Sequence, residues 1–328
     1  MKKVSIIVVN YNGKNQLEAC LKSLVVQSFD DVEIIFVDNA SSDNSIEYVR
    51  DVYPNIMALS LSENKGFAGG NLEGLKHAGG QYIMLLNNDT EVAGDCISNL
   101  VSLLDGSSDI GICAAKMVVY GTNIIDSAGD GYSTLLKGFK RGEGKHAEAY
   151  DTEEYVFGAC AGAALYRREM LEEIGFFDED FFLIHEDTDL SFRAQLAGWK
   201  VMFVPTAAVR HKVRSTIGHM SDMAIYYTLR NSEFVRIKNV PLGLFLRCLP
   251  AFVGGTISEF VYFVLRHGKL MLYLKAKRDV IKNLKTMLGK RRKIMKMKKV
   301  SNKYLYSLMT PIWNREFFSM KINKFFHG

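Results

Sequence analysis

Short apolar runs alternate with helix-like stretches over the first two hundred residues of this chain. Each run is almost continuously apolar, as expected for a strand that is buried on both faces of a sheet. The stretches between the runs carry apolar residues at helical spacing, as at Leu17, Cys20 and Leu24. The repeated order of strand and helix predicts an α/β fold with a mostly parallel central sheet flanked by helices. The predicted strands are Val4 to Val9, Val32 to Val37, Ile56 to Leu61 and Tyr82 to Leu86.

The regular pattern weakens in the middle of the chain. Between about Tyr120 and Glu154 the sequence is rich in glycine and charge, and we expect an insertion or a flexible loop there. Regularity returns with a helix over Arg168 to Ile174 and a strand over Lys200 to Val204. Because proline cannot donate a ladder hydrogen bond, Pro205 is expected to end that strand.

The last third of the chain has a different character, with long helical stretches that are apolar or basic. We therefore predict two regions, 1–215 and a helical C-terminal extension over 216–328. The most apolar stretch, Leu244 to Leu265, contains Arg247 and Pro250. A helix that spans a bilayer needs about 20 apolar residues with few charges, so a span is disfavoured here.

The extension is also strongly basic. Lys275 to Lys303 holds thirteen Lys or Arg and one acid, a local net charge of +12, which leaves −7 for the rest of a chain of net charge +5. Such a helix is typical of a membrane interface, and we expect residues 244–303 to bind an anionic membrane surface. The alternative is a helix that packs on the main region with a solvated basic face. Nucleic acid is disfavoured because the basic stretch lacks interleaved aromatic residues for base stacking. The apolar face comprises Val280, Ile281, Leu284, Met287, Leu288, Ile294 and Met295.

Composition places the chain among ordinary folded proteins, with 328 residues, 48% hydrophobic and 23% charged. Its five cysteines are scattered without a Cys-x-x-Cys pair, which argues against a disulfide framework or a zinc cluster. The apolar run at Val4 to Val9 is too short for a secretory signal core. We therefore expect a protein of the reducing cytoplasm.

Polar residues follow three of the predicted strands. In an open parallel sheet, ligands bind just beyond the carboxyl ends of the strands. Asp89, in Asn87-Asn88-Asp89, lies where a divalent cation and a phosphate can be held, although Asn and Asp also favour simple turns. Asp38 can accept hydrogen bonds from a ribose hydroxyl or a pyrimidine N–H, or it is only a helix cap. Tyr11 offers a ring face for a base, or it is only a packed loop aromatic.

A second acidic site comes later in the chain, at Glu186 and Asp187. Paired carboxylates repel, which raises one pKa and can produce a general base for an attacking hydroxyl. The alternative is that these acids only favour the first turn of a helix through its dipole. His211 follows, and it is either a structural side chain or a neutral nitrogen ligand.

Five stretches together resemble the family-2 inverting glycosyltransferases of GT-A fold, especially the rhamnosyltransferase-like branch. The resemblance covers roughly Val4 to Arg214, about two thirds of the chain. Each motif is weak alone, but five in order with suitable spacing are highly specific. They are Val8-Val9-Asn10-Tyr11-Asn12, Val37-Asp38-Asn39-Ala40-Ser41-Ser42-Asp43, Asn64-Lys65-Gly66-Phe67-Ala68-Gly69-Gly70-Asn71, Leu86-Asn87-Asn88-Asp89 and Glu186-Asp187-Thr188-Asp189-Leu190.

The resemblance implies a donor site at the strand ends. Tyr11 and Asp38 would contact the nucleoside, and Asn71 would belong to the same donor-binding set, together with Asn87 and Asn88. The segment from Asn87 to Asp89 stands in the place of the Asp-x-Asp metal motif. Asp89 would be the main protein ligand of Mg²⁺ or Mn²⁺, whereas Asn87 replaces a carboxylate of the acidic form.

The resemblance also implies a reacting side. Asp187 matches the general base of the family, with Glu186 beside it as a group that orients the acceptor. His211, which lies 24 residues after Asp187, would contribute to the metal site. The segment from Gly158 to Ala163 resembles the part that lines the sugar and acceptor pocket.

These inferences predict an inverting glycosyltransferase that uses a nucleotide-diphosphate sugar as its donor. Thymidine-diphosphate rhamnose is the first expectation for the donor, and a uridine-diphosphate sugar is the second. The acceptor would be a hydroxyl of a glycan or lipid-linked glycan in cell-surface polysaccharide synthesis, and the protein would be peripheral on the inner face of the cell membrane. One alternative is a nucleotidyltransferase that makes nucleotide sugars, for which Asn10-Tyr11-Asn12-Gly13-Lys14 is a poor phosphate loop. The other is a non-catalytic protein that binds sugar or nucleic acid.

Overall fold

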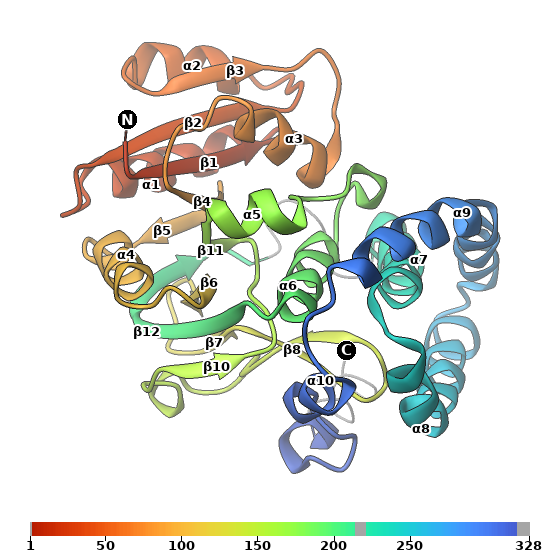
Figure 1. Cartoon of the computed structure of the whole chain (residues 1–328). Coiled ribbons are helices and arrows are strands. Elements are labelled where there is room, and N and C mark those ends of the chain that lie inside the picture. Colours follow the sequence, from red (N-terminus) through yellow and green to blue (C-terminus); the bar gives the residue numbers. More distant parts are fainter. Residues whose placement is uncertain (1, 214–220, 320–328) are drawn as a thin grey trace.

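A mixed sheet of ten strands forms the centre of the computed structural model, which describes residues 2–213 and 221–319 (Figure 1). Its main path has the order β10-β12-β6-β11-β4-β1-β2-β3, with β5 paired to β12 and β7 paired to β6. The strands β8 and β9 form a separate hairpin. The strands are β1 (Val4–Asn10), β2 (Val32–Asp38), β3 (Met57–Ser60), β4 (Tyr82–Asn87), β5 (Thr90–Val92), β6 (Ile110–Val119), β7 (Ile125–Ser127), β8 (Asp130–Tyr132), β9 (Gly138–Lys140), β10 (Glu154–Val156), β11 (Ala163–Arg167) and β12 (Lys200–His211).

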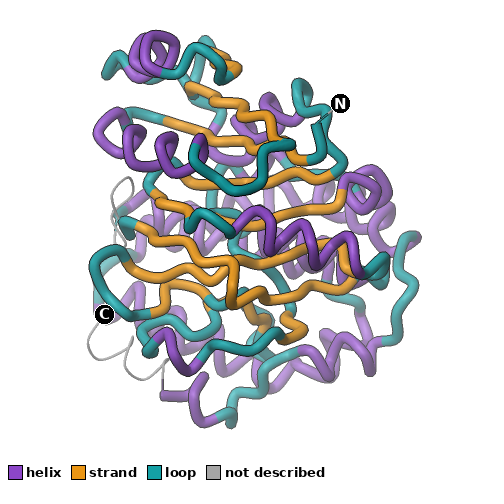
Figure 2. The backbone as a smooth tube through the Cα atoms, turned by 90° about the vertical axis from the view of Figure 1, so that its left-hand side faces the viewer, coloured by secondary structure: helices purple, strands orange, loops and turns teal. Residues whose placement is uncertain are grey.

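Helices cover both faces of this sheet, and Figure 2 shows the strands one below another between them. Apolar side chains of α1, α2 and α4 pack on one face, and those of α3, α5 and α6 pack on the other. The apolar residues that recur at helical spacing in the sequence therefore belong to two separate hydrophobic cores, one on each face of the sheet. The helices are α1 (Lys14–Val25), α2 (Ser45–Val52), α3 (Gly66–Leu75), α4 (Cys96–Gly106), α5 (Arg168–Ile174), α6 (Glu186–Ala197), α7 (Asp222–Asn239), α8 (Leu242–Phe260), α9 (Leu270–Lys296) and α10 (Asn302–Leu308), with short 3₁₀ turns η1 (Ala147–Ala149) and η2 (Glu179–Phe181) and a π-helical turn η3 (Val261–Arg266).

The prediction of parallel strands holds in the first part of the sheet, where β4, β1, β2 and β3 are all parallel. In this register Asn10 lies beside Asp38, and Val9 lies beside Asn87. The polar residues that end these strands therefore meet at one edge of the sheet, as expected for a parallel sheet.

Beyond β4 the sheet contains antiparallel as well as parallel pairs. The expectation of a mostly parallel sheet therefore applies only to its first part. The strand β11 is antiparallel to both of its neighbours, β4 and β6. The prediction that Pro205 ends its strand was also wrong, because β12 runs on to His211. The pairing of β12 with β6 shifts between Val204 and Ala208, and such a bulge accommodates proline within a strand. The bulge thus allows the same strand to carry His211.

The region from Tyr120 to Glu154 is not a structureless loop, which corrects that expectation. It contains β7, β8, β9 and η1, and several of its polar side chains are buried. The backbone of Asp130 exchanges two hydrogen bonds with Gly158, at 2.7 and 2.9 Å. Asp126 is buried and pairs with Lys140 inside the protein, whereas the composition of the region suggested a loop.

The helices α7 to α10 form the C-terminal region that the sequence predicted, and α7 packs against both α6 and α9 (Figure 1). One stretch of the described residues, Leu242–Arg266, is long and apolar enough to cross a bilayer, and only 17% of its most apolar window is buried. It comprises α8, which contains Pro250, and the turn η3.

Candidate active site

A cavity of about 600 Å³ lies where the strand ends meet the beginning of α6. Its volume is within the range of about 300–1,000 Å³ that is typical of small-molecule sites. It is lined by Asn87, Asn88 and Asp89 on one side and by Glu186 and Asp187 on the other. The two polar sites of the sequence therefore face one space. Tyr11, Asn39, Asp130, Phe139, Lys140, Cys160, Ala161, Gly162 and Phe182 are among the other lining residues.

A hydrogen-bonded network of amides fixes the three strand ends on the donor side. The side-chain nitrogen of Asn88 donates to Oδ1 of Asn10 at 2.6 Å, and the nitrogen of Asn10 donates to Oδ1 of Asp38 at 3.3 Å. Oδ2 of Asp38 accepts from the backbone N–H of Ser41 at 3.0 Å. A Cβ on Gly13 would lie 2.3 Å from the amide nitrogen of Asn88, so this close approach requires glycine.

The predicted donor residues take different places around this network. Tyr11 lines the cavity and is 41% exposed, so its ring is available to a base. Asp38 is buried, and its carboxylate braces the strand ends behind the lining. Asn71 is also buried, but its amide donates to the carbonyl of Phe67 within α3, and it is not among the lining residues. Asn39, which sequence reasoning did not single out, lines the cavity instead.

The side chains of Asp89 and His211 meet at one edge of the cavity. Nε2 of His211 lies 3.1 Å from Oδ1 of Asp89, and Nδ1 lies 2.8 Å from Oδ2 of Asp126. Nζ of Lys140 bonds to both oxygens of Asp126, at 2.7 and 2.9 Å. Burial alone would lower the pKa of His211, but its hydrogen bonds to Asp126 and Asp89 raise that pKa to about 9. The four groups form one network of alternating charge, in which Lys140 is half-buried and the other three side chains are buried.

A divalent cation at Asp89 and His211 would take one carboxylate oxygen and one imidazole nitrogen, and it would displace the proton that Nε2 of His211 shares with Asp89. Within the described residues, no group of three or more His, Cys, Asp and Glu side chains converges on one metal position. A two-residue set fits Mg²⁺ or Mn²⁺ at a diphosphate, because such ions take one or two protein ligands and fill their other positions with phosphate oxygens and water. The residues present therefore suit a cation that arrives with a nucleotide.

The reacting side of the cavity is the first turn of α6. Oδ1 of Asp187 accepts from the backbone N–H of Thr188 at 2.6 Å, and Oδ2 accepts from that of Ala161 at 3.3 Å. Oε2 of Glu186 is buried and has no hydrogen-bond partner in the described protein, although Glu186 lines the cavity. A buried acceptor of this kind is costly unless a ligand supplies a donor.

The carboxyl groups of Asp130, Glu186 and Asp187 lie close together, so the negative charge of one disfavours ionisation of the others. Burial and the carboxylate of Asp187 raise the pKa of Glu186 well above its ordinary value. The same two causes raise the pKa of Asp130 to about 8. Burial also raises the pKa of Asp187, although hydrogen bonds from Thr188 and Ala161 oppose that rise. The backbone N–H donors of Thr188 and Ala161 thus favour the ionised form of Asp187.

The loop before α6 holds an unusual backbone conformation. Phe182, Ile184 and His185 have φ angles of 62°, 67° and 73°, which is strained for side chains other than glycine. Asn231 of α7 donates to the carbonyls of Phe181, Leu183 and Ile184 at 2.9, 2.8 and 2.7 Å. A residue of the C-terminal region thus holds the loop that presents Glu186 and Asp187.

Sequence reasoning missed three charged residues of the site, Asp126, Asp130 and Lys140. All three come from the region between Tyr120 and Glu154 that was expected to be an insertion or flexible loop. Their strands are three residues long, too short to show a periodicity. The sequence did offer one signal for these residues, since Asp126 and Asp130 stand four residues apart beside glycines.

An α/β fold with a cavity at the carboxyl ends of parallel strands is typical of enzymes that bind a small molecule there. The chain belongs to the glycosyl transferase family 2, whose family model matches residues 5–175. This membership favours the glycosyltransferase prediction over the nucleotidyltransferase and the non-catalytic binding protein. The GT-A fold prediction is confirmed by solved structures of glycosyltransferases.

Among proteins of known function, the chain is 24% identical over 222 residues to poly-beta-1,6-N-acetyl-D-glucosamine synthase of Staphylococcus aureus (strain MSSA476), which covers 66% of this chain and 52% of the relative. The protein of the same name from Staphylococcus epidermidis is 24% identical over 272 residues, covering 80% of this chain and 63% of the relative. The chain thus spans about half the length of the first of these relatives.

Two solved structures share the fold at low sequence identity. GalNAc-T7 with UDP, GalNAc and Mn²⁺ superposes with a TM-score of 0.63 at 16% identity, covering 87% of this chain and 58% of the other. Staphylococcus aureus TarS 1–349 in complex with UDP-GlcNAc superposes with a TM-score of 0.59 at 18% identity, covering 90% of both chains.

Proposed function

We propose that this enzyme transfers a sugar, with inversion at the anomeric carbon, from a nucleotide-diphosphate sugar to a hydroxyl of a glycan acceptor. The observation that carries the proposal is that Asp89 and Asp187 line the same cavity. Had they lain on opposite sides of the molecule, they could not act on one substrate. The volume of the cavity suits a nucleotide sugar of ordinary size.

On the donor side, the network around Asn10 presents a fixed surface to the nucleoside, with the ring of Tyr11 beside it. Asp89 and His211 would hold Mg²⁺ or Mn²⁺, and Asp126 would keep the imidazole oriented through its Nδ1. When bound, the cation neutralises charge on the departing diphosphate. Asn87, which also lines the cavity, supplies a neutral amide where a second carboxylate would otherwise stand.

On the reacting side, Asp187 would remove the proton of the acceptor hydroxyl as that oxygen attacks the anomeric carbon. The proton ends on the carboxylate of Asp187, the glycosidic bond forms and the bond to the diphosphate breaks. Oε2 of Glu186, buried without a partner, would orient the acceptor through one of its hydroxyls. Attack opposite to the leaving group inverts the configuration, and no second nucleophilic carboxylate is needed.

The sugar and base of the donor are part of the proposal. The motifs resemble the rhamnosyltransferase-like branch, which favours thymidine-diphosphate rhamnose. A uridine-diphosphate sugar is favoured by the names of the relatives, which make poly-N-acetylglucosamine or are bound to UDP-GlcNAc. Both pyrimidine nucleotides would present an N–H of similar kind to the donor side.

We further propose that 1–215 carries the transfer chemistry and that 216–328 places the enzyme on an anionic membrane, on the cytoplasmic side, where a lipid-linked acceptor would be presented. Support comes from α8, whose exposed apolar residues recur along one side, and from the basic α9. The exposed residues on α8 include Leu242, Leu246, Leu249, Val253, Ile257 and Phe260.

A membrane test should keep the fold intact. Because Asn231 supports the loop before α6, the test should use point variants of the full chain rather than a truncation. Replacing Leu246, Val253 and Ile257 by serine should reduce sedimentation with vesicles that contain phosphatidylglycerol. Equal sedimentation of the triple variant would contradict membrane docking through α8.

The transfer itself is tested with nucleotide sugars. Thermal unfolding of the full chain with UDP-GlcNAc or thymidine-diphosphate rhamnose should show stabilisation that depends on Mn²⁺, since a ligand at 100 times its Kd adds about 2.7 kcal/mol. Slow donor hydrolysis should release a nucleoside diphosphate. Release of inorganic pyrophosphate, or no stabilisation by any nucleotide sugar, would contradict the proposal.

A further inference from the structure

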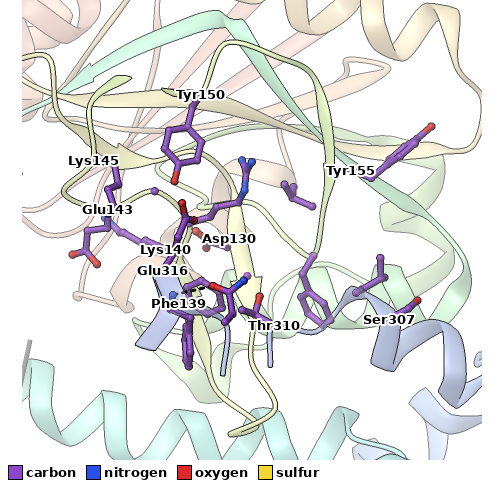
Figure 3. A pocket seen from close by; sticks show the side chains of 18 residues that line it. Asp130, Phe139, Lys140, Glu143, Lys145, Tyr150, Tyr155, Ser307, Thr310 and Glu316 are labelled. Carbon is purple, nitrogen blue, oxygen red and sulfur yellow. Dashed lines mark hydrogen bonds between the residues drawn. The ribbon is translucent and has the colours of Figure 1, made fainter. Parts of the chain in front are cut away.

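A second cavity of about 300 Å³ adjoins the first and is not used by the mechanism above (Figure 3). It lies between the hairpin of β8 and β9, the strand β10 and the chain segment from Ser307 to Phe317. Asp130, Phe139 and Lys140 line both cavities, so these side chains form the partition between them. A ligand that extends beyond the first cavity would meet this partition directly.

The lining of the second cavity combines aromatic rings with both signs of charge. Tyr150, Tyr155, Phe157 and Phe317 contribute rings, as Figure 3 shows for the two tyrosines. Such a surface is too polar for a lipid chain. Acids and bases both line the cavity, so it lacks the uniformly basic surface that a phosphate or another anion requires. The charged lining residues are Asp130, Glu143 and Glu316 against Lys140, Arg141 and Lys145.

A neutral sugar suits these features. Its C–H edges pack on aromatic rings, and its hydroxyls both donate and accept hydrogen bonds, as lysines, carboxylates and amides require. Asn314 and Thr310 add neutral polar groups to the lining. A volume of about 300 Å³ is at the lower end for small-molecule sites, and so it favours one or two sugar rings over a long chain.

The partition between the two cavities belongs to the hairpin of β8 and β9, and its side chains are closely packed. The ring of Phe139 packs against that of Phe317, tilted by 59° with 4.8 Å between centroids, and a Cβ on Gly131 would lie 2.3 Å from the Phe139 ring. Gly138, which begins β9, lies against Thr188, since a Cβ there would be 3.0 Å from the Thr188 side chain. The hairpin thus reaches from the second cavity to the residue next to Asp187.

We propose that the second cavity binds the neutral sugar residue of the acceptor that precedes the one bearing the attacking hydroxyl. This proposal rests on the proposed transfer reaction, because it needs an acceptor glycan at Asp187. The enzyme then recognises at least two acceptor residues, one on each side of the partition. An oligosaccharide acceptor is accordingly bound more tightly than its terminal monosaccharide.

The test uses an array of neutral mono-, di- and trisaccharides, including N-acetylglucosamine and rhamnose oligomers, with the full chain in the presence of UDP and Mn²⁺. Ser307→Trp places a bulky ring at the second cavity, from an exposed position on α10. Lys303→Trp, also exposed on α10 but not among the lining residues, is the matched control. At least one oligosaccharide should bind about tenfold more tightly than its monosaccharide, as expected for one or two ring contacts.

Ser307→Trp should remove that preference, and Lys303→Trp should keep it. The proposal is overturned if no oligosaccharide is preferred over its monosaccharide, if acidic oligosaccharides are preferred, or if Ser307→Trp binds as the wild type does. Stabilisation by UDP and Mn²⁺ is measured in the same samples. Retained stabilisation by UDP and Mn²⁺ without an oligosaccharide preference defeats the subsite alone. An oligosaccharide preference without stabilisation by either UDP-GlcNAc or thymidine-diphosphate rhamnose, each tested in parallel, defeats the transfer reaction and keeps the subsite.

Discussion

The two sides of the active-site cavity are built from different chemistry. On the part of the donor side that faces the nucleoside, amides of Asn10, Asn39 and Asn88 fix the strand ends through hydrogen bonds of 2.6 to 3.3 Å. On the reacting side, the side chains that meet are ionisable carboxyl groups, and the carboxylate of Asp187 helps to raise the pKa of both Glu186 and Asp130. The comparison shows that hydrogen bonds between amides hold the geometry of the nucleoside site, whereas neighbouring charges set the pKa values of the carboxyl groups on the reacting side.

This difference predicts how substitutions divide. Changes on the donor side should alter nucleotide affinity with little effect on the chemical step, because the amides hold geometry without titrating near neutral pH. Changes on the reacting side should alter rate or stability, because each removes a charge that neighbouring charges require.

The largest effect is expected for Asp187→Asn. An amide cannot take the proton of the acceptor, so transfer should fall by about 10²–10⁴-fold. Affinity for UDP-GlcNAc, measured by calorimetry with Mn²⁺, should stay within a few-fold of the wild type. A large loss of donor affinity instead would show that Asp187 binds the donor, and it would contradict the division of the cavity into two sides.

Lys238→Met should be the most destabilising substitution. Nζ of Lys238 bonds Asp178 at 2.6 Å and Asp189 at 2.8 Å and is almost fully buried, so its loss leaves each carboxylate with one fewer cationic partner. Lys290 remains beside Asp178, and Arg193 remains beside Asp189. Loss of one partner of a buried pair costs about 3–5 kcal/mol, seen here as a lower midpoint in urea. The matched control is Lys299→Met, since the pair with Glu173 is exposed and should be worth about 1 kcal/mol or less. Equal effects would show that α6 is not anchored through Lys238.

Asp126→Asn should weaken Mn²⁺ binding by about 10–100-fold, because the carboxylate that orients His211 is replaced by an amide. Electron paramagnetic resonance of free Mn²⁺ measures this without any catalytic turnover. An unchanged Mn²⁺ affinity would remove Asp126 from the cation site and leave it as a partner of Lys140 only.

The donor side is tested by Asn10→Ala. It removes the bridge between Asn88 and Asp38, which amounts to two hydrogen bonds, and should lower UDP affinity by about tenfold. The rate at saturating donor should change little. A fall in that rate as large as the fall in affinity would show that the strand ends also position the reacting groups.

The smallest effect concerns stability in acid. Burial alone would raise the pKa of Asp178, but Lys238 and Lys290 lower it to about 2. This pKa lies below the unfolded value near 3.9, so the pair stabilises the fold above that pH and the contribution is lost as pH falls toward 2. Urea midpoints between pH 5 and 2 should fall more steeply for the wild type than for Asp178→Asn. Parallel curves would contradict this assignment.

The same comparison explains what the sequence could predict. The strands β1, β2 and β4 are long apolar runs, so their polar ends at Asp38 and Asn87 to Asp89 are visible in the sequence and meet because parallel strands share an edge. Asp187 was visible because it stands beside another acid at the start of a helix. These features depend on local pattern.

The remaining features depend on distant partners. Asp126 and Asp130 lie on strands of three residues, and their role appears only when His211 and Asp187 are brought to them. Pro205 suggested a strand end because a bulge cannot be read from one strand. Asn231 gave no signal at all, since its three acceptors are backbone carbonyls of a loop about 50 residues earlier.

The central claim is that one cavity holds the cation of the donor at Asp89 and the base at Asp187. Anomalous diffraction from a crystal of the full chain with Mn²⁺ and UDP tests it most directly. The account predicts a manganese peak bonded to Oδ1 of Asp89 and Nε2 of His211, with the diphosphate between it and the side of the cavity that carries Asp187. A peak bonded to Glu186 and Asp187, with Asp89 left away from the metal, would contradict it.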